Sequence, residues 1–217
     1  MPLAVTEQTV GRLSLYRRLL GRLRAEAVSH IYSHELARMA RVTAPQVRRD
    51  MMVLGSTGSP RHGYDVAELL RAIDEYLDVP GGQHVAVIGI GNLGQALLAF
   101  FSGRRPNLSV AAGFDIDPRK TDRVVHGCRI YPLERLAEVV KEENIDVALL
   151  SVPAAQAQDV ADLCAKVGVR GILNFAPVPL HVPRGTYVSD VDLTMSLEKV
   201  AFFARHTDAV RDEPART

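Results

Sequence analysis

Apolar positions recur with a helical spacing in the first third of the chain and as short continuous runs in the remainder. From Gly11 to Ala27, apolar residues return every three or four positions, which predicts a helix after a loose arm at 1–10. The spacing predicts three more helices, at 34–40, 44–54 and 66–77. Leu36, Met39 and Ala40 are the expected buried positions of the first of these, with Ser33 as its cap.

Beyond Gly82 the pattern changes to apolar runs of the kind found in strands that are buried on both faces. These strands alternate with helices, which predicts a doubly wound parallel sheet of the Rossmann type. The strands are expected at 85–88, 110–114, 128–131, 146–152, 171–175 and 187–191, and the helices at 95–101, 133–142 and 154–167. Asp78–Gly82 contains one Pro and two Gly and is the expected boundary. We therefore expect domains at 1–79 and 80–191, followed by a C-terminal helix and tail at 192–217.

The last helix, predicted from Asp192 to Arg205, has an apolar stripe that Phe202 and Phe203 broaden. A helix this apolar must be buried, either on its own domain or by exchange with a second subunit. Residues 207–217 are expected to fray.

A glycine fingerprint lies where the first strand of the sheet ends. Gly89, Gly91 and Gly94 form Gly-x-Gly-x-x-Gly between a strand and a helix, the context that dinucleotide binding requires. Gly89 permits the tight turn, Gly91 lets the backbone approach a pyrophosphate, and Gly94 allows close packing of the helix. The helix N-terminus then faces the phosphate charge. The open alternative is a glycine turn in an α/β domain that binds no nucleotide.

An acidic residue follows at the spacing that this motif needs. Asp115 lies 21 residues after Gly94, at the end of the next strand, where a carboxylate binds the ribose hydroxyls. A carboxylate there favours NAD(H) over NADP(H), although the nearby Arg119 and Lys120 keep the second cofactor open. Because ligands of such sheets bind beyond the carboxyl ends of the strands, Val152, Pro153 and Asn174 are expected near the nicotinamide half.

The helices at 34–40 and 44–54 are separated by a short turn and predict a helix-turn-helix. Thr43 and Gln46 have the spacing of a capping box, and Pro45 suits the first helical turn. Gln46, Arg48 and Arg49 lie off the apolar face, where they could read bases in a major groove. The turn-rich stretch 55–64 suits a wing. A small helical subdomain with solvated arginines is the alternative.

Charge supports a polyanionic partner for the first part of the chain. The net charge is +1, but residues 1–64 hold ten Arg, no Lys and four acids, so they carry +6. The remainder therefore carries −5. This asymmetry indicates nucleic-acid binding by the first domain, with a merely solvated basic surface as the alternative.

The remaining composition argues against catalysis and against a membrane. No apolar run is long enough to span a bilayer, and a signal peptide is not evident, so we expect a cytoplasmic protein. Cys128 and Cys164 are too few for a disulfide framework or a zinc site. No catalytic dyad or metal-ligand cluster is recognisable, and a lone His181 is more often structural. The nucleotide domain is therefore interpreted as a sensor.

Residues 10–206 resemble the Rex family of redox-sensing transcriptional repressors, which respond to the NADH/NAD⁺ ratio. The matching stretches are 12–16, 42–50, Gly55, 63–66, 89–94, 114–117, 174–178 and 192–203. The resemblance implies a winged helix before a Rossmann domain, a palindromic operator, and a homodimer whose last helix is domain-swapped. It also implies release from DNA by NADH, and an aromatic residue of the last helix, Phe202 or Phe203, near the partner's nicotinamide pocket.

The resemblance also implies the contact residues. The expected DNA contacts are Arg12, Tyr16, Thr43, Ala44, Gln46, Arg48, Arg49, Arg61 and His62. The expected NAD(H) contacts are Gly89, Ile90, Gly91, Asn92, Leu93, Gly94, Asp115, Val152, Pro153, Asn174, Phe202 and Phe203. The wing departs from the family pattern Lys-Arg-Gly-Val-Gly-Tyr, because Ser59-Pro60-Arg61-His62-Gly63-Tyr64 shifts the Arg by one place. The operator sequence is therefore not carried over.

Two other classes of protein stay open. An NAD-dependent oxidoreductase with an added N-terminal module would turn over NADH with a small carbonyl substrate. A CoA-type nucleotide-binding module with a basic arm would bind nucleic acid without sequence preference.

Overall fold

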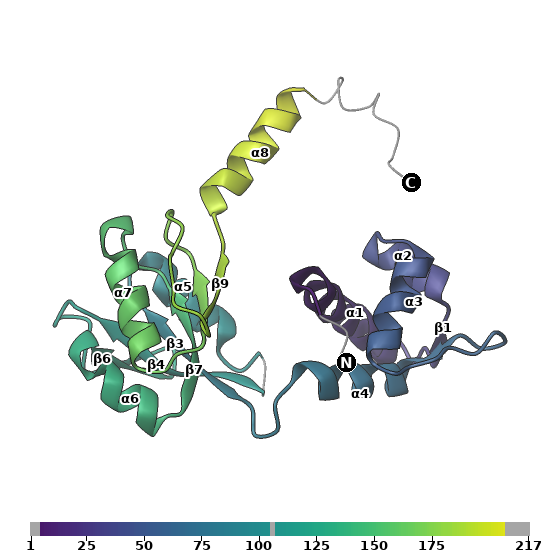
Figure 1. Cartoon of the computed structure of the whole chain (residues 1–217), viewed down its shortest axis with the longest axis horizontal. Coiled ribbons are helices and arrows are strands. Elements are labelled where there is room, and N and C mark those ends of the chain that lie inside the picture. Colours follow the sequence, from purple (N-terminus) through teal and green to yellow (C-terminus); the bar gives the residue numbers. More distant parts are fainter. Residues whose placement is uncertain (1–4, 105–106, 207–217) are drawn as a thin grey trace. The chain divides into compact units, whose positions relative to one another are not determined.

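The structure is a computed structural model that describes residues 5–104 and 107–206. The chain divides into two compact units, residues 1–80 and 81–217, and Figure 1 shows the elements of each. The tail at 207–217, which was expected to fray, lies outside the described residues.

The first unit contains four helices and a two-stranded sheet. The helices are α1 (Glu7–Ala25), α2 (Ser33–Ala40), α3 (Ala44–Val53) and α4 (Val66–Leu77). Strand β1 (His30–Ile31) pairs antiparallel with β2 (Tyr64–Asp65). Their apolar faces meet in one core, which includes the fully buried Leu13, Leu20, Leu36, Val47, Met51 and Ile73.

Capping residues explain where the helices of this unit begin. Thr43 and Asp65 accept from the backbone N–H groups of Gln46 and Glu68, so α3 and α4 start where the sequence predicts. Helix α1 already begins at Glu7, because Thr6 accepts from Thr9 N, so the expected loose arm is wrong from residue 7 onward.

Helix α2 differs from the expectation at two points. Tyr32 is its N-cap, and its backbone N–H donates to Glu35 Oε2 at 2.8 Å, so Ser33 is the first helical residue and does not cap. Ala37 is buried, while Met39 is 42% exposed, so Met39 was wrongly assigned to the core. The buried face of α2 therefore consists of Leu36, Ala37 and Ala40.

Helices α2 and α3 form the predicted helix-turn-helix. Arg41 ends α2 in the left-handed conformation with φ +55°. Beyond α3, Ser59 and Gly63 exchange two backbone hydrogen bonds of 2.7 and 2.8 Å, which close a small hairpin with Arg61 and His62 at its tip. The first unit is therefore a winged helix-turn-helix, as the sequence predicts.

The second unit is a seven-stranded sheet in the order β5-β6-β4-β3-β7-β8-β9. All neighbouring pairs are parallel except β5 with β6. The strands are β3 (Gln83–Ile88), β4 (Leu108–Asp115), β5 (Arg123–Val125), β6 (Cys128–Pro132), β7 (Ile145–Leu150), β8 (Gly171–Asn174) and β9 (Tyr187–Asp190). The edge strand β5 was not predicted; a tight turn with positive φ at His126 and Gly127 folds it back onto β6.

Helices cover both faces of this sheet, as the prediction of a doubly wound sheet requires. Ala86 and Ile88 of β3 face the core formed with α6 (Leu136–Glu142) and α7 (Ala154–Lys166). Val85 and Val87 face the other core, formed with α5 (Asn92–Phe101). A short 3₁₀ turn (Leu133–Arg135) leads into α6. The strand order reverses at β3, between β4 and β7, which is where ligands of such sheets bind.

The last helix, α8 (Leu193–Arg205), is capped by Asp192, whose side chain accepts from Met195 N. It contains no buried residue. Its large apolar side chains are all at least 46% exposed; these are Leu193, Met195, Leu197, Val200, Phe202 and Phe203. The apolar stripe that the sequence predicts is present, and the other described residues of the second unit do not cover it.

Candidate functional site

A cavity of about 510 Å³ opens at the carboxyl ends of β3, β4 and β7. The glycine turn and the start of α5 form one side of it, through Gly89, Gly91, Asn92 and Leu93. The other sides come from the ends of β4 and β7, with the acidic residues of 115–117 and with Ser151, Val152 and Pro153. Its size suits a ligand much larger than an ion.

Gly89 and Gly94 have the structural roles that the motif predicts, in the tight turn and in the close packing of α5. Gly89 has φ +92°, and a Cβ there would lie 2.6 Å from the carbonyl oxygen of Ser151. A Cβ at Gly94 would lie 1.9 Å from the carbonyl oxygen of Gly89, so only glycine allows α5 to approach the turn. A Cβ at Gly91 would meet nothing within 4 Å. The backbone at Gly91 therefore borders open space at a helix N-terminus, which suits an anionic pyrophosphate.

Asp115 is fixed at the edge of this cavity by backbone donors. Its side chain is 7% exposed and accepts from Ile90 N at 2.7 Å and from Asp117 N at 2.8 Å. Lys120 Nζ lies 3.2 Å from the same carboxylate. The bond to Ile90 joins the end of β4 to the glycine turn, so the carboxylate is held at a fixed distance from the helix N-terminus.

Of the two cations near Asp115, only Lys120 borders the cavity. Arg119 pairs instead with Asp117, at 3.1 Å from Nε and 3.0 Å from Nη2. The Arg119 guanidinium lowers the pKa of Asp117 to about 2. Lys120 is therefore the cation that bears on whether the site could accept the 2′-phosphate of NADP(H), the alternative that the sequence left open.

The structure brings most of the expected cofactor residues to this cavity, but not all of them. Ile90 is fully buried and takes part through its backbone. Asn174 is also fully buried and does not border the cavity. Its amide donates to Val178 O and Asp190 Oδ1, and its oxygen accepts from Ala176 N. The expectation for Asn174 is corrected on this ground, since its side chain fixes the loop after β8.

Phe202 and Phe203 do not border the cavity of their own chain. They are 52% and 55% exposed on α8 and contact each other edge to face, with ring centroids 5.4 Å apart. Sequence reasoning missed Leu133 and Gln156, which border the cavity from the segments that follow β6 and β7. The rule that ligands bind beyond strand ends could have indicated both positions.

In the first unit, Asp50 of α3 lies at the centre of a buried group of side chains. Arg12 of α1 donates to it from Nε at 2.7 Å and from Nη2 at 2.8 Å. Tyr16 Oη donates at 2.9 Å and Gln46 Nε2 at 2.9 Å. We call these four residues the Asp50 cluster. It ties the recognition helix α3 to α1.

The electrostatics of the Asp50 cluster favour the ionised carboxylate. Burial alone would raise the pKa of Asp50, but the hydrogen bonds from Arg12, Gln46 and Tyr16 outweigh burial, so the pKa is lowered. Burial and the bond to Asp50 raise the pKa of Tyr16. Tyr16 is fully buried, so the expectation that it contacts DNA is corrected: its place is beneath the surface. The Arg12 charge is likewise already paired.

Other residues of α3 remain on the surface. Arg48 and Arg49 are exposed; Arg48 Nη1 donates weakly to Ser33 Oγ at 3.3 Å, and Arg49 has no partner among the described residues. Thr43 caps the helix, and Ala44 and Gln46 are half-buried in its first turn. Arg49 is therefore the expected residue of α3 most available to a phosphate.

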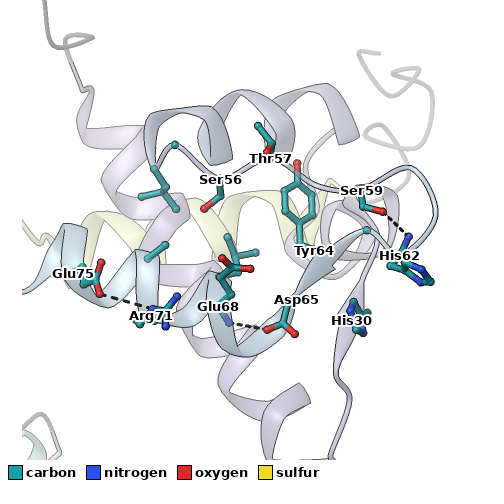
Figure 2. A pocket seen from close by; sticks show the side chains of 15 residues that line it. His30, Ser56, Thr57, Ser59, His62, Tyr64, Asp65, Glu68, Arg71 and Glu75 are labelled. Atoms are coloured by element: carbon teal, nitrogen blue, oxygen red, sulfur yellow. Dashed lines mark hydrogen bonds and ion pairs between the residues drawn. The ribbon is translucent and has the colours of Figure 1, made fainter.

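The wing carries the exposed Arg61 and His62, whose backbone N–H groups both donate to Ser59 Oγ. A second cavity of about 510 Å³ lies beside this wing and is bordered by β1 and α4; Figure 2 shows the side chains that line it. Asp65, Glu68 and Glu75 lie along it with Arg71 as their cationic neighbour. Three carboxylates repel phosphate, so DNA is expected at the wing tip and not in this cavity.

Other kinds of site find little support in the part of the chain that the structure describes. It holds no group of three or more His, Cys, Asp or Glu side chains arranged for a metal ion. None of the helices within 5–104 and 107–206 is long and apolar enough to cross a membrane. The two cysteines are buried free thiols. His181 is exposed, and its backbone exchanges hydrogen bonds with the Gln158 side chain.

Comparison with known families agrees with the division of the chain into two units. Residues 82–178 match the model of the CoA binding domain, and residues 4–51 match a family described as putative DNA-binding protein N-terminus. The chain is 39% identical over 201 residues to the redox-sensing transcriptional repressor Rex of Carboxydothermus hydrogenoformans, covering 93% of this chain and 97% of that protein. It is 38% identical to the Rex protein of Limosilactobacillus reuteri, covering 93% and 94%.

Solved structures of a Rex-family repressor, RSP, are similar over nearly the whole chain. The complex of RSP with β-NAD⁺ and operator DNA has a TM-score of 0.87 at 30% identity and covers 96% of both chains. The complex with β-NADH has a TM-score of 0.82 at 30% identity and covers 96% of this chain and 98% of that chain.

Proposed function

Because this chain belongs to the Rex family of redox-sensing transcriptional repressors, we propose that it binds operator DNA and releases it when NADH occupies the cavity of its Rossmann unit. Transcription of the genes it controls then follows the NADH/NAD⁺ ratio. RSP has been solved with NAD⁺ on operator DNA and with NADH, which supports the same pair of ligands here.

The observation that carries this proposal is the buried Asp115 carboxylate beside the open backbone at Gly91, in a chain whose other unit presents a recognition helix. The Asp115 carboxylate would accept hydrogen bonds from the hydroxyls of the adenosine ribose. The start of α5 would face the pyrophosphate, and Val152 and Pro153 would border the nicotinamide half. The bound dinucleotide supplies the redox signal, since only its nicotinamide ring differs between the two forms.

We propose that a second copy of the chain covers α8. An exposed helix with six large apolar side chains is costly in water, and exchange of the helix between two copies would bury it. Phe202 or Phe203 would then border the partner's nicotinamide pocket. An apolar wall favours the neutral reduced ring over the positively charged oxidised ring, because burial of an unpaired charge is costly.

The same dimer would place two recognition helices on a palindromic operator, with a spacing that matches the DNA repeat. Closure around NADH would change that spacing. A hundredfold loss of operator affinity requires an unfavourable coupling of about 2.7 kcal/mol between NADH and DNA. Linkage then requires operator DNA to weaken NADH binding by the same factor.

The decisive experiment is fluorescence anisotropy with the chain's own upstream DNA and random competitor, titrated separately with NAD⁺ and NADH. We expect release by NADH at concentrations where NAD⁺ has little effect. The variant Asp115→Ala should bind DNA and fail to respond, whereas Asp146→Ala at the opposite end of β7 should respond normally. Binding that is indifferent to both nucleotides would contradict the proposal.

A regulator of this kind needs no catalytic residue, and we propose that the chain is not an enzyme and acts in the cytoplasm. Turnover of NADH with a small carbonyl substrate would contradict the proposal that the chain is not an enzyme. Calorimetry that finds equal NADH affinity with and without operator would contradict the coupling.

A further inference from the structure

Asp50 determines which end of the Gln46 side-chain amide is directed away from the Asp50 carboxylate. Gln46 is the third residue of α3, in the first turn, where recognition helices contact base edges. Its Nε2 donates to Asp50 Oδ1 at 2.9 Å. A glutamine side chain ends in one donor group and one acceptor, so the direction of the amide sets what DNA meets.

The charge on Asp50 permits only one orientation of the Gln46 amide. Asp50 is 2% exposed and accepts from Arg12, which holds it ionised, so its carboxylate can only accept. Only the amino end of the Gln46 amide can therefore face Asp50. The carbonyl oxygen Oε1 is directed away from it, together with one remaining N–H of Nε2.

We propose that Asp50 is a positioning residue for base recognition: it orients the Gln46 amide so that Oε1 reads an exocyclic amino group in the major groove, on adenine or cytosine. The inference rests on the proposed function, since it assumes that α3 enters the groove of an operator. Adenine N6 and cytosine N4 are the donors that the major groove displays, whereas guanine and thymine display acceptors there. With its amide fixed, Gln46 would favour adenine, whose N7 also accepts the free N–H.

The cluster makes this orientation rigid without any contact of its own to DNA. Arg12 and Tyr16 reach Asp50 from α1, so the carboxylate is fixed from a second element and cannot rotate with the Gln46 side chain. A fixed amide loses less conformational freedom on binding and penalises the wrong base more strongly than a free one.

The test uses the full chain and an operator selected from random duplexes. At each position of one half-site, adenine is replaced by purine deoxyriboside and cytosine by its 4-deamino analogue, so that only the exocyclic amino group is lost. We expect one position at which this loss weakens wild-type binding by about fivefold or more. The variant Gln46→Ala should be insensitive there and unchanged elsewhere.

Two further variants separate positioning from folding. Asp50→Asn keeps the size of the side chain but can donate, which frees the Gln46 amide to turn around. We expect it to lose most of the sensitivity to the amino group. In the Gln46→Ala background, Asp50→Asn should add no further loss of base discrimination, because its effect passes through Gln46. A purely structural role would instead lower affinity for all duplexes alike in both backgrounds.

The outcomes distinguish this inference from the proposed function. Operator binding that NADH still abolishes, but with no position sensitive to the amino group in a Gln46-dependent way, overturns the inference alone. Equal discrimination by wild type and Asp50→Asn also overturns it. Absence of any sequence preference in the wild type overturns both.

Discussion

Asp50 in the first unit and Asp115 in the second are both almost completely buried carboxylates; Asp50 lies within α3, and Asp115 lies at the end of β4 next to the glycine turn that precedes α5. They differ in their hydrogen-bond donors. Asp50 receives side chains from two helices, whereas Asp115 receives two backbone N–H groups and one lysine. Side-chain donors enclose Asp50 and exclude a ligand. Backbone donors leave Asp115 at the edge of a cavity, so the same functional group holds other side chains in one unit and is open to a ligand in the other.

Truncation of the enclosed carboxylate should have the largest effect. Asp50→Ala leaves the Arg12 guanidinium and the buried Tyr16 hydroxyl without their acceptor. We expect the first unit to lose about 3 kcal/mol of unfolding free energy, measured by urea denaturation. Glu75→Ala, which removes an exposed ion pair of 3.9 Å with Arg71, should change it by about 0.5 kcal/mol or less. Equal losses of unfolding free energy in Asp50→Ala and Glu75→Ala would contradict the distinction between a buried and an exposed carboxylate.

Truncation of the Asp115 carboxylate should weaken binding of the ligand. Asp115→Ala removes the acceptor at the ribose end of the cavity, and we expect NADH affinity to fall by about 1.5–3 kcal/mol, or roughly ten- to hundredfold. Calorimetry measures this change. Operator binding in the absence of nucleotide should be retained, and an equal loss of both activities would argue against separate roles of the two units.

Acid should weaken the first unit through Asp50. Its pKa is lowered in the folded state, so its contribution to stability is present above the unfolded value of 3.8 and is lost as the pH falls through the folded value. The loss should be smaller than that of Asp50→Ala, because a protonated carboxyl still fills its space. Acid titration of unfolding by circular dichroism should give a flatter curve below pH 3.8 for Asp50→Asn; identical curves would assign the acid sensitivity to other groups.

Lys120 should tune the open site by a smaller amount. It is one-third exposed and partly neutralises Asp115, so Lys120→Met should strengthen the repulsion of a 2′-phosphate. We expect the preference for NADH over NADPH to rise by up to about fivefold, corresponding to about 1 kcal/mol or less. Arg119→Met, which removes the exposed partner of Asp117, is the matched control. A lower preference in Lys120→Met would reverse the assigned role.

Oxidation of the two thiols should have the least effect on function, because both thiols are buried. Burial raises the pKa of Cys128 to about 11 and that of Cys164 to about 12, so both stay protonated near neutral pH. We expect mild peroxide to leave operator binding within about twofold, in contrast to a redox-active cysteine. Rapid labelling of the folded protein by a thiol reagent would contradict this.

Local chemistry explains which features the sequence reveals. The caps at Thr43 and Asp65, the glycine turn and the acidic end of β4 each depend on residues close in the chain, and the structure confirms each of these elements. The wing hairpin follows from turn residues in the same way. Such features need no knowledge of the tertiary fold.

The role of Asp50 needs the tertiary fold. In the sequence it follows two arginines and has the appearance of a solvated acid, while its partners Arg12 and Tyr16 lie 38 and 34 residues away. Three expected DNA contacts, Arg12, Tyr16 and Gln46, are therefore parts of the Asp50 cluster. Asn174 was misassigned for a related reason, because its amide donates to Val178 in the loop after β8 and to Asp190 at the end of β9.

Through helix α8, the oligomeric state of the protein would depend on its concentration. In the dimer proposed above, α8, which has no buried side chain in one copy, would be buried by a second copy, and the free energy of that association would depend on the protein concentration. The response of such a molecule is then a property of its copy number as well as of its affinities. At low expression, dilution alone would separate the subunits and weaken binding to a two-fold operator, whatever the supply of nucleotide.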